Sequence, residues 1–471
     1  MSVTPCYARR LADPDHLHHF LQSCQKQCQQ ANQSFIVSVT QPLSLVEPLA
    51  ILQRFHLSDQ RSFYWEAQQK QSAIAAWGIC QEKIITGKNR FQQTQDFVNY
   101  CQNQIIELKA SQIAEAGLKF LTNFSFFSAS SCQAHFPDAT IFIPRWQVSR
   151  SDDSCFLTYN FFLSCDTNLA TIEAELRNKI QEIEQVGKSI ITFPFSLGSP
   201  FQTSEIQQPS QFKSAVKLAL KDIESQELTK IVLAHHLDVV SPVPFSPYLS
   251  LHYLRQKYPH CYIFSVSNGQ GTTFLGATPE RLFSLRQQHL ISDALAGSAP
   301  RSKTPKIDRQ LADNLLHSEK ERREHQAVSC YIMKQLEALG LTPQRSRRQL
   351  LKLSNIQHLW TLIEAEVPSN INPMAILAKL HPTPAVAGVT TEVACEKISQ
   401  YETFDRALYA APIGWLDTAG NAEFMVGIRS AMINKNQARL YAGAGIVAGS
   451  NPDKELAEIQ LKLQAMLKAL Q

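Results

Sequence analysis

The chain has 471 residues, which is enough for two or three average domains or for one large α/β unit. Its 45 lysines and arginines are balanced by 41 aspartates and glutamates, giving a formal charge of +4, so neither a nucleic acid nor a membrane surface is the expected partner. No run of about 18 apolar residues is present, which excludes a transmembrane helix, and the N-terminus lacks the apolar stretch of a signal peptide. The 11 cysteines form no CxxC pair, so we expect reduced thiols in a cytoplasmic protein that acts on a small molecule.

The first 190 residues or so combine short β-like runs with glutamine-rich polar stretches. This pattern predicts strands that are joined by variable loops and helices. A helix is predicted near 170–188, and the Ser/Pro/Gln-rich stretch 195–211 is typical of a connector.

The elements are better marked from about residue 210 onward. Apolar periodicity predicts helices over 212–225, 247–258 and 318–340, and a last helix that begins at Pro452 with Asn451 as its N-cap. Strands are predicted over 230–240, 409–418, 422–433 and 438–447, and hairpin-like strands over 261–277 and 281–297. Hairpins of strands interleaved with helices indicate an α/β (α+β) fold with antiparallel sheets rather than a doubly wound one.

Four glutamates lie in two helical patterns far apart in the chain. Glu321 and Glu324 form one pair, and Glu455 and Glu458 form the other, each with i, i+3 spacing that places both carboxylates on one helix face. Two such faces turned toward each other would hold a hard divalent cation, most plausibly Mg²⁺. The alternative is that each face is a solvated surface with ion pairs to neighbours such as Lys462.

The segment GAGIVA over 443–448 superficially resembles a dinucleotide-binding fingerprint. Too few residues follow it to complete a mononucleotide-binding unit. We interpret its small residues as a place where backbone N–H groups and the following helix N-terminus approach an anion, with a plain tight turn as the alternative.

Three further residues can be interpreted either as structural groups or as functional ones. Lys230 opens an apolar strand and Glu280 follows a proline, so each is ordinarily a solvated terminal group; if both line one pocket, a desolvated lysine is a base and a buried carboxyl is an acid. Arg429 lies in a run that looks buried, and its guanidinium therefore needs a carboxylate, either a structural one or that of a substrate. His325 and His358, taken alone, are more often satisfied core or helix groups.

Taken together, these segments resemble the chorismate-utilising enzymes and, within them, the isochorismate synthases. The resemblance covers roughly 210–465 and rests on KIVLAHHLDV, FLGATPERLF, DALAGSAPR, LLHSEKERREHQAV, NIQHL, HPTPAVAG, GWLDTAGNAEFMVGIRSA and YAGAGIVAGSNPDKELAEIQLKL. It implies one large unit with two antiparallel sheets flanked by helices and the site in a cleft between them. Residues 208–466 would be the catalytic region, and residues 1–200 a variable part of the same fold.

The resemblance also implies a role for each matching residue. Lys230 would activate water for attack on C2 of chorismate, and Glu280 would protonate the departing C4 hydroxyl. Glu324 and Glu458 would bind Mg²⁺, with Glu321 and Glu455 acting through water. The residues that would bind the substrate or shape its pocket are Gly297, Ser298, His358, Ala385, Tyr409, Arg429, Gly443, Gly445 and Lys462.

Two positions separate the branches of this family. Aminating members carry another residue in place of Lys230, and the chain has no GxCxG nucleophile motif, so neither amination nor a glutaminase subunit is expected. Salicylate synthases resemble one another in having threonine where this chain has Ala385, and alanine favours stopping at isochorismate. Salicylate synthase, a non-catalytic anion-binding regulator and an amination enzyme remain the alternatives. The N-terminal part weakly favours the menaquinone or phylloquinone branch over the siderophore and salicylate branches, and a monomer is expected.

The chain departs from the family pattern at two positions. His235 stands where arginine is usual, which puts one ionic contact in doubt. Ser298 stands where threonine is common, and it keeps the hydroxyl.

Overall fold

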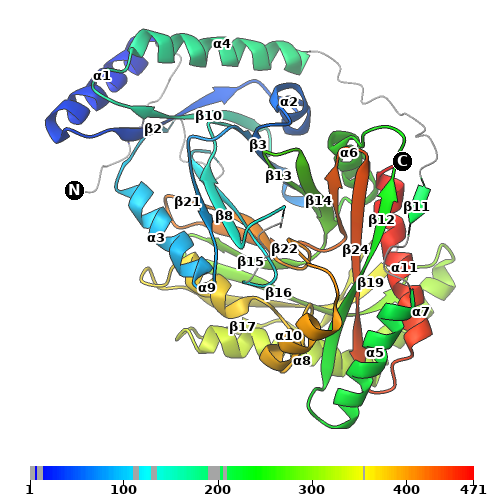
Figure 1. Ribbon diagram of the computed structural model, residues 1–471. Coiled ribbons are helices and arrows are strands. Elements are labelled where there is room, and N and C mark those ends of the chain that lie inside the picture. The colour runs from blue at the N-terminus through cyan, green and yellow to red at the C-terminus, as the bar shows by residue number, and fades with distance from the viewer. Residues whose placement is uncertain are drawn as a thin grey trace.

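The computed structural model describes residues 6–7, 14–109, 116–128, 135–188, 202–204, 209–353 and 356–471. Within these ranges the strands form one 14-stranded and one 10-stranded sheet (Figure 1). Neighbouring strands are antiparallel except where β6 pairs with β1 and with β2, so the prediction of two mostly antiparallel sheets is confirmed. Most of the predicted connector 195–211 lies outside the described residues.

The strand and helix bounds are as follows. The larger sheet contains β1 Cys6–Tyr7, β2 Phe35–Leu43, β3 Arg61–Ala67, β4 Ser72–Trp77, β6 Ile105–Lys109, β9 Trp146–Ser151, β10 Ser154–Leu163, β11 Gln202–Ser204, β12 Lys230–Val240, β13 Tyr262–Asn268, β14 Thr272–Thr278, β20 Gly388–Val389, β23 Ser430–Asn434 and β24 Gln437–Val447. The smaller sheet contains β5 Gln81–Ile85, β7 Lys119–Phe124, β8 Ala139–Ile143, β15 Arg281–Arg286, β16 His289–Pro300, β17 Gln344–Arg345, β18 Gln349–Lys352, β19 Ile356–Glu366, β21 Pro412–Asp417 and β22 Ala422–Val426. The α-helices are α1 Pro14–Ala31, α2 Pro48–Phe55, α3 Arg90–Gln102, α4 Leu169–Lys188, α5 Pro209–Glu224, α6 Pro247–Lys257, α7 Pro305–His317, α8 Glu319–Glu337, α9 Pro373–Leu380, α10 Thr391–Tyr401 and α11 Pro452–Ala469.

The core lies between the two sheets. Trp65 of β3 and Trp415 of β21 belong to different sheets, are both almost fully buried and meet edge to face with ring centroids 6.3 Å apart. Pairing also joins the two halves of the sequence, because β3 pairs with β13 and β7 pairs with β21. The N-terminal part therefore contributes strands to both sheets.

Helices cover the outer surfaces. Helices α5 and α11 lie beside β12 and β24, whereas α8 packs against β16 and β19 (Figure 1). Helix α11 begins as predicted, with the Asn451 side chain accepting hydrogen bonds from the backbone N–H groups of Asp453 and Lys454. None of the helices in the described ranges is long and apolar enough to cross a membrane.

One predicted strand differs from the structure. The run 422–433 is not one strand: β22 ends at Val426 in one sheet and β23 begins at Ser430 in the other, with Arg429 at φ +50° between them. Local sequence did not indicate this break, because a crossing between sheets is a tertiary effect. The strand predicted over 438–447 is confirmed as β24, and the pairing of Gly443 and Gly445 with Ala234 and Val232 rules out the alternative of a tight turn at these glycines.

Candidate active site

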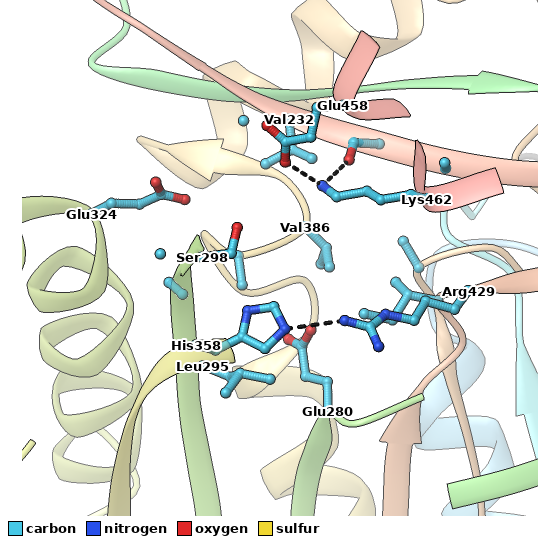
Figure 2. A pocket seen from close by; sticks show the side chains of 18 of the residues that line it. Val232, Glu280, Leu295, Ser298, Glu324, His358, Val386, Arg429, Glu458 and Lys462 are labelled. Carbon is cyan, nitrogen blue, oxygen red and sulfur yellow. Dashed lines mark hydrogen bonds and ion pairs between the residues drawn. The ribbon is translucent and has the colours of Figure 1, made fainter. Parts of the chain in front are cut away.

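One cavity of about 190 Å³ collects side chains from both sheets and from α8 and α11. Fourteen of the fifteen predicted site residues line it, namely Glu280, Gly297, Ser298, Glu321, Glu324, His358, Ala385, Tyr409, Arg429, Gly443, Gly445, Glu455, Glu458 and Lys462. Figure 2 shows Glu324, Glu458 and Lys462 at one end of this pocket and Glu280, His358 and Arg429 at the other.

Lys230 is the exception, and it lies just behind the pocket wall. It is the first residue of β12, it is 4% exposed, and its Nζ donates a 2.7 Å hydrogen bond to Glu324 Oε1. Gly445 makes this placement possible, since a Cβ there would lie 3.1 Å from Lys230 Cε. The ammonium group therefore reaches the pocket edge through its ion pair with Glu324.

The four predicted metal ligands crowd one another electrostatically. Burial raises the pKa of Glu321, and the nearby charge of Glu324 raises it further; burial and Glu458 likewise raise the pKa of Glu455. Burial also opposes ionisation of Glu324, but Lys230 outweighs it and holds the pKa of Glu324 below its ordinary value.

This donor set suits Mg²⁺ chemically. Four carboxylates supply the hard oxygen ligands that this ion takes, and a divalent cation would relieve their mutual repulsion. The geometry is open, because no three potential ligands in the described ranges converge on one point. Lysines occupy two carboxylates instead: Lys230 binds Glu324, and Lys462 lies 2.8 Å from Glu458.

Glu280 provides a buried carboxyl at the far end. It lies between β14 and β15 and is 6% exposed, and its backbone N–H donates to Thr278 Oγ1 while its carbonyl accepts from Val426. Burial raises the pKa of Glu280 to about 7, although Lys230 opposes the shift. A carboxyl with this pKa can still carry a proton near neutral pH, as a general acid must.

Arg429 faces the pocket from the chain segment that crosses between the sheets. Its Nη2 donates a 3.0 Å hydrogen bond to His358 Nε2, and no carboxylate within the described ranges pairs with it. Burial, followed by the charge of Arg429, holds the pKa of His358 well below its ordinary value. A neutral imidazole thus orients a guanidinium that has donors left for an anionic ligand.

Backbone groups form the rest of the wall. A Cβ at Gly443 would lie 2.8 Å from the Tyr409 hydroxyl, so glycine keeps this wall open. Lys462 Nζ donates to the Gly443 carbonyl at 2.7 Å, and Ser298 N–H donates to Glu321 Oε2 at 3.2 Å.

The sequence analysis missed several residues that line the pocket and the ion pair that lies behind its wall. Val232, Leu295, Val386, Ile428 and Tyr441 line the pocket, and Lys320 lies at its edge beside the carboxylates. Period-2 alternation along β12 could have indicated Val232, two residues after Lys230. His235 lies outside the pocket lining, and its ring centroid is 5.7 Å from that of Phe212 of α5. The departure from the usual arginine at this position therefore does not fall on the pocket wall.

A buried ion pair fixes two walls of the pocket. Arg406 donates to the carbonyls of Val232 and Val386 at 2.8 and 3.1 Å, and it pairs with Glu402 at 2.6 Å. Glu402 in turn accepts from the backbone N–H of Ala234 at 2.7 Å. Strand β12 is thereby tied to the segment that carries Ala385 and Val386.

Comparisons with known proteins agree with this geometry. A family model described as chorismate binding enzyme matches residues 20–471. The isochorismate synthase DhbC of Bacillus subtilis is 37% identical over 281 residues, covering 58% of this chain and 71% of that protein. The salicylate biosynthesis isochorismate synthase of Pseudomonas aeruginosa is 30% identical over 434 residues, covering 90% of this chain and 88% of that protein.

A solved structure is also similar over nearly the whole chain. The menaquinone-specific isochorismate synthase MenF from Escherichia coli superposes with a TM-score of 0.76 at 25% identity. The match covers 96% of this chain and 100% of that chain. It therefore includes the N-terminal strands as well as the region that carries the pocket.

Proposed function

The chain belongs to the chorismate binding enzyme family, and within this family we propose that it is an isochorismate synthase that converts chorismate to isochorismate. The observation that carries the proposal is the placement of a buried acid opposite a buried lysine. Glu280, whose pKa is raised to about 7 by burial, lies at one end of the pocket, and Lys230 lies behind Glu324 at the other. Binding alone would need no such pair, which argues against a non-catalytic regulator.

The proposed reaction balances with one base and one acid. A water oxygen forms a bond to C2 of the ring as Lys230 accepts the water proton. The ring double bonds shift, the C4–O bond breaks, and Glu280 donates its proton so that the C4 oxygen departs as water. Lys230, whose Nζ donates to Glu324 in the structure, must first lose a proton, because only the neutral amine has a lone pair that can accept the water proton.

We propose Glu324 and Glu458 as the Mg²⁺ ligands, with Glu321 and Glu455 supporting the ion through water. When bound, Mg²⁺ would supply charge neutralisation and a fixed template for the ring carboxylate. Both pairs come from helix faces that the fold brings to one end of the pocket. Lys230 and Lys462, which pair with Glu324 and Glu458 in the structure, are the cations this ion would replace.

Substrate contacts follow from the groups left exposed in the pocket. We propose that Arg429 and the backbone of Gly443 and Gly445 bind the enolpyruvyl carboxylate, since Arg429 has donors to spare. Gly297, Ser298, His358, Tyr409 and Lys462 would shape the remaining surface, with Ala385 beside the ring. Residues 208–466 would form the catalytic region, and residues 1–200 the variable part of the same fold.

For the pathway we propose the quinone branch, menaquinone or phylloquinone. The support is the full-length similarity to a menaquinone-specific enzyme, including the N-terminal strands. A salicylate synthase, which would also release pyruvate, is the second candidate, and Ala385 speaks against it. We further propose that the protein acts as a monomer without a glutaminase subunit.

The test is an incubation of the purified protein with chorismate and Mg²⁺, with and without a chelator, followed by chromatography of the products. Isochorismate that fails to form in the presence of chelator is the expected result. Salicylate together with pyruvate would assign the protein to the second candidate. An aminated product upon addition of ammonia, or no turnover at all, would contradict the proposed function.

A further inference from the structure

A second cavity, of about 670 Å³, adjoins the pocket on the far side of Lys230 and Glu324. Its walls come from α5, α8, β20 and the ends of β12 and β24; half of the lining residues are apolar, including Leu228, Val389 and Val447, and most of the others are charged. Glu324 and Lys320 border both cavities. The two spaces therefore meet at the charged cluster and nowhere along the apolar walls.

Lys230 borders only the second of these cavities. Its strand neighbours explain this, because Lys230 pairs with Val389 on one side and Val447 on the other, and both residues line the second cavity. Toward the first pocket, Gly445 lies under the lysine stem. The proposed base therefore lies in the wall between the substrate pocket and the larger second cavity.

The small size of the substrate pocket makes the position of Lys230 between the two cavities relevant to how water reaches it. A space of about 190 Å³ is small for a pocket that must hold a ten-carbon diacid, so bound chorismate leaves little room for water to pass it. Glu280, the proposed proton donor to the C4 oxygen, lies at the opposite end of the pocket from Glu324, to which Lys230 donates a hydrogen bond (Figure 2). A water destined for C2 therefore needs another way to the lysine.

We propose that the second cavity is the route by which water reaches Lys230, separate from the entrance used by chorismate. This inference rests on the proposed function. One water enters from the second cavity and comes to lie beside Lys230, and its oxygen then bonds to C2 with the proton transfers and C4–O cleavage of the reaction proposed above. The charged groups on the cavity wall, Lys230, Lys320, Arg323 and Glu324, give such a water the polar partners that it needs.

Filling the second cavity from two sides tests the route. Ala327 of α8 and Ala448 after β24 both line it, and Ala448 is exposed and tolerant of a larger side chain. Ala327→Leu and Ala448→Leu should each lower turnover about tenfold, while the Kd for chorismate, measured by equilibrium dialysis, stays unchanged. The matched control is Gln326→Leu, since Gln326 is exposed on the same helix and does not line either cavity.

Single turnovers in H₂¹⁸O separate the failure of the route from the failure of the proposed function. The wild-type protein should place ¹⁸O at C2, and the filled variants should place the same label there but at a lower single-turnover rate, because fewer waters reach Lys230. If the wild type makes no isochorismate, the proposed function fails. If it does, and the filled variants match Gln326→Leu in single-turnover rate, the route is wrong; should Ala327→Leu not fold, Ala448→Leu decides alone.

Discussion

Two buried ion pairs hold strand β12, and they differ in how completely their groups are used. Arg406 and Glu402 are 1% and 4% exposed by side chain, make two hydrogen bonds to each other and bind backbone groups at Val232, Ala234 and Val386. Lys230 and Glu324 share one hydrogen bond, and Glu324 borders both cavities whereas Lys230 borders only the second. A buried charge whose nitrogens are all hydrogen-bonded holds the surrounding backbone in one arrangement. A buried charge with unused hydrogen-bonding groups beside a cavity can exchange partners.

The largest expected effects come from Lys230, the proposed base and a member of the pair that can exchange, and from Glu280, the proposed acid. Lys230→Ala and Glu280→Gln should each reduce the turnover of chorismate by about 10²- to 10⁴-fold, the range usual for loss of a general base or acid. Chorismate binding and Mg²⁺ binding, followed by calorimetry, should remain because neither side chain is a proposed ligand of the metal or of a substrate carboxylate. A variant that kept near-normal turnover would remove its residue from the proposed mechanism.

Substitution of the Arg406–Glu402 pair should change the stability of the fold rather than the turnover. Arg406→Met leaves Glu402 buried without its cation and should destabilise the fold by about 3–5 kcal/mol, as measured by urea unfolding. The double variant Arg406→Met, Glu402→Met should recover most of that loss, because two apolar side chains replace the whole pair. If the single and double variants unfolded at the same urea concentration, the pair would not hold the surrounding backbone as described above.

The site was more predictable than the fold details around it, for a physical reason. Residues of the site carry charges or glycines in fixed local patterns, such as the i, i+3 glutamates of α8 and α11, and these patterns survive without knowledge of tertiary contacts. The strand Lys230–Val240 and the N-cap of α11 were predictable from local apolar and capping signals.

The features that could not be predicted from the sequence depend on tertiary contacts. The break at Arg429 follows from a crossing between sheets, which no local pattern indicates. The role of Arg406 is invisible locally, because its partners at Val232 and Val386 are distant in sequence. Nothing in the pattern around Lys230 could indicate that it borders a second cavity.

The pH dependence separates the two ends of the pocket. Glu280 can serve as the proposed acid only when it is protonated, so turnover should fall as pH rises through about 7, the value to which burial raises the pKa of Glu280. The same shift affects stability. The folded state holds this proton more tightly than the unfolded state, whose carboxyl ionises near 4.5, so the wild type should lose stability as pH rises from about 4.5 to 7.

Glu280→Gln provides the control for this effect, because glutamine does not titrate. Its free energy of unfolding relative to the wild type should therefore increase over the same pH interval, as followed by urea titrations at several pH values. A constant difference between the two proteins would show that Glu280 has an ordinary pKa in the folded state.

The smallest expected effect concerns Ala385, whose substitution we expect to change the products more than the rate. Ala385 lies on the segment that Arg406 ties to β12, and its backbone N–H donates to Thr383 Oγ1 at 3.2 Å. Ala385→Thr adds a hydroxyl to the pocket without touching Lys230, Glu280 or the carboxylates, so isochorismate formation should change little. A small yield of pyruvate with salicylate, detected by coupling to lactate dehydrogenase, should appear because the new hydroxyl stands where salicylate synthases have theirs. Ala385→Ser, which adds the hydroxyl without the methyl group, separates polarity from bulk; pyruvate from the wild type itself would instead favour the salicylate synthase assignment.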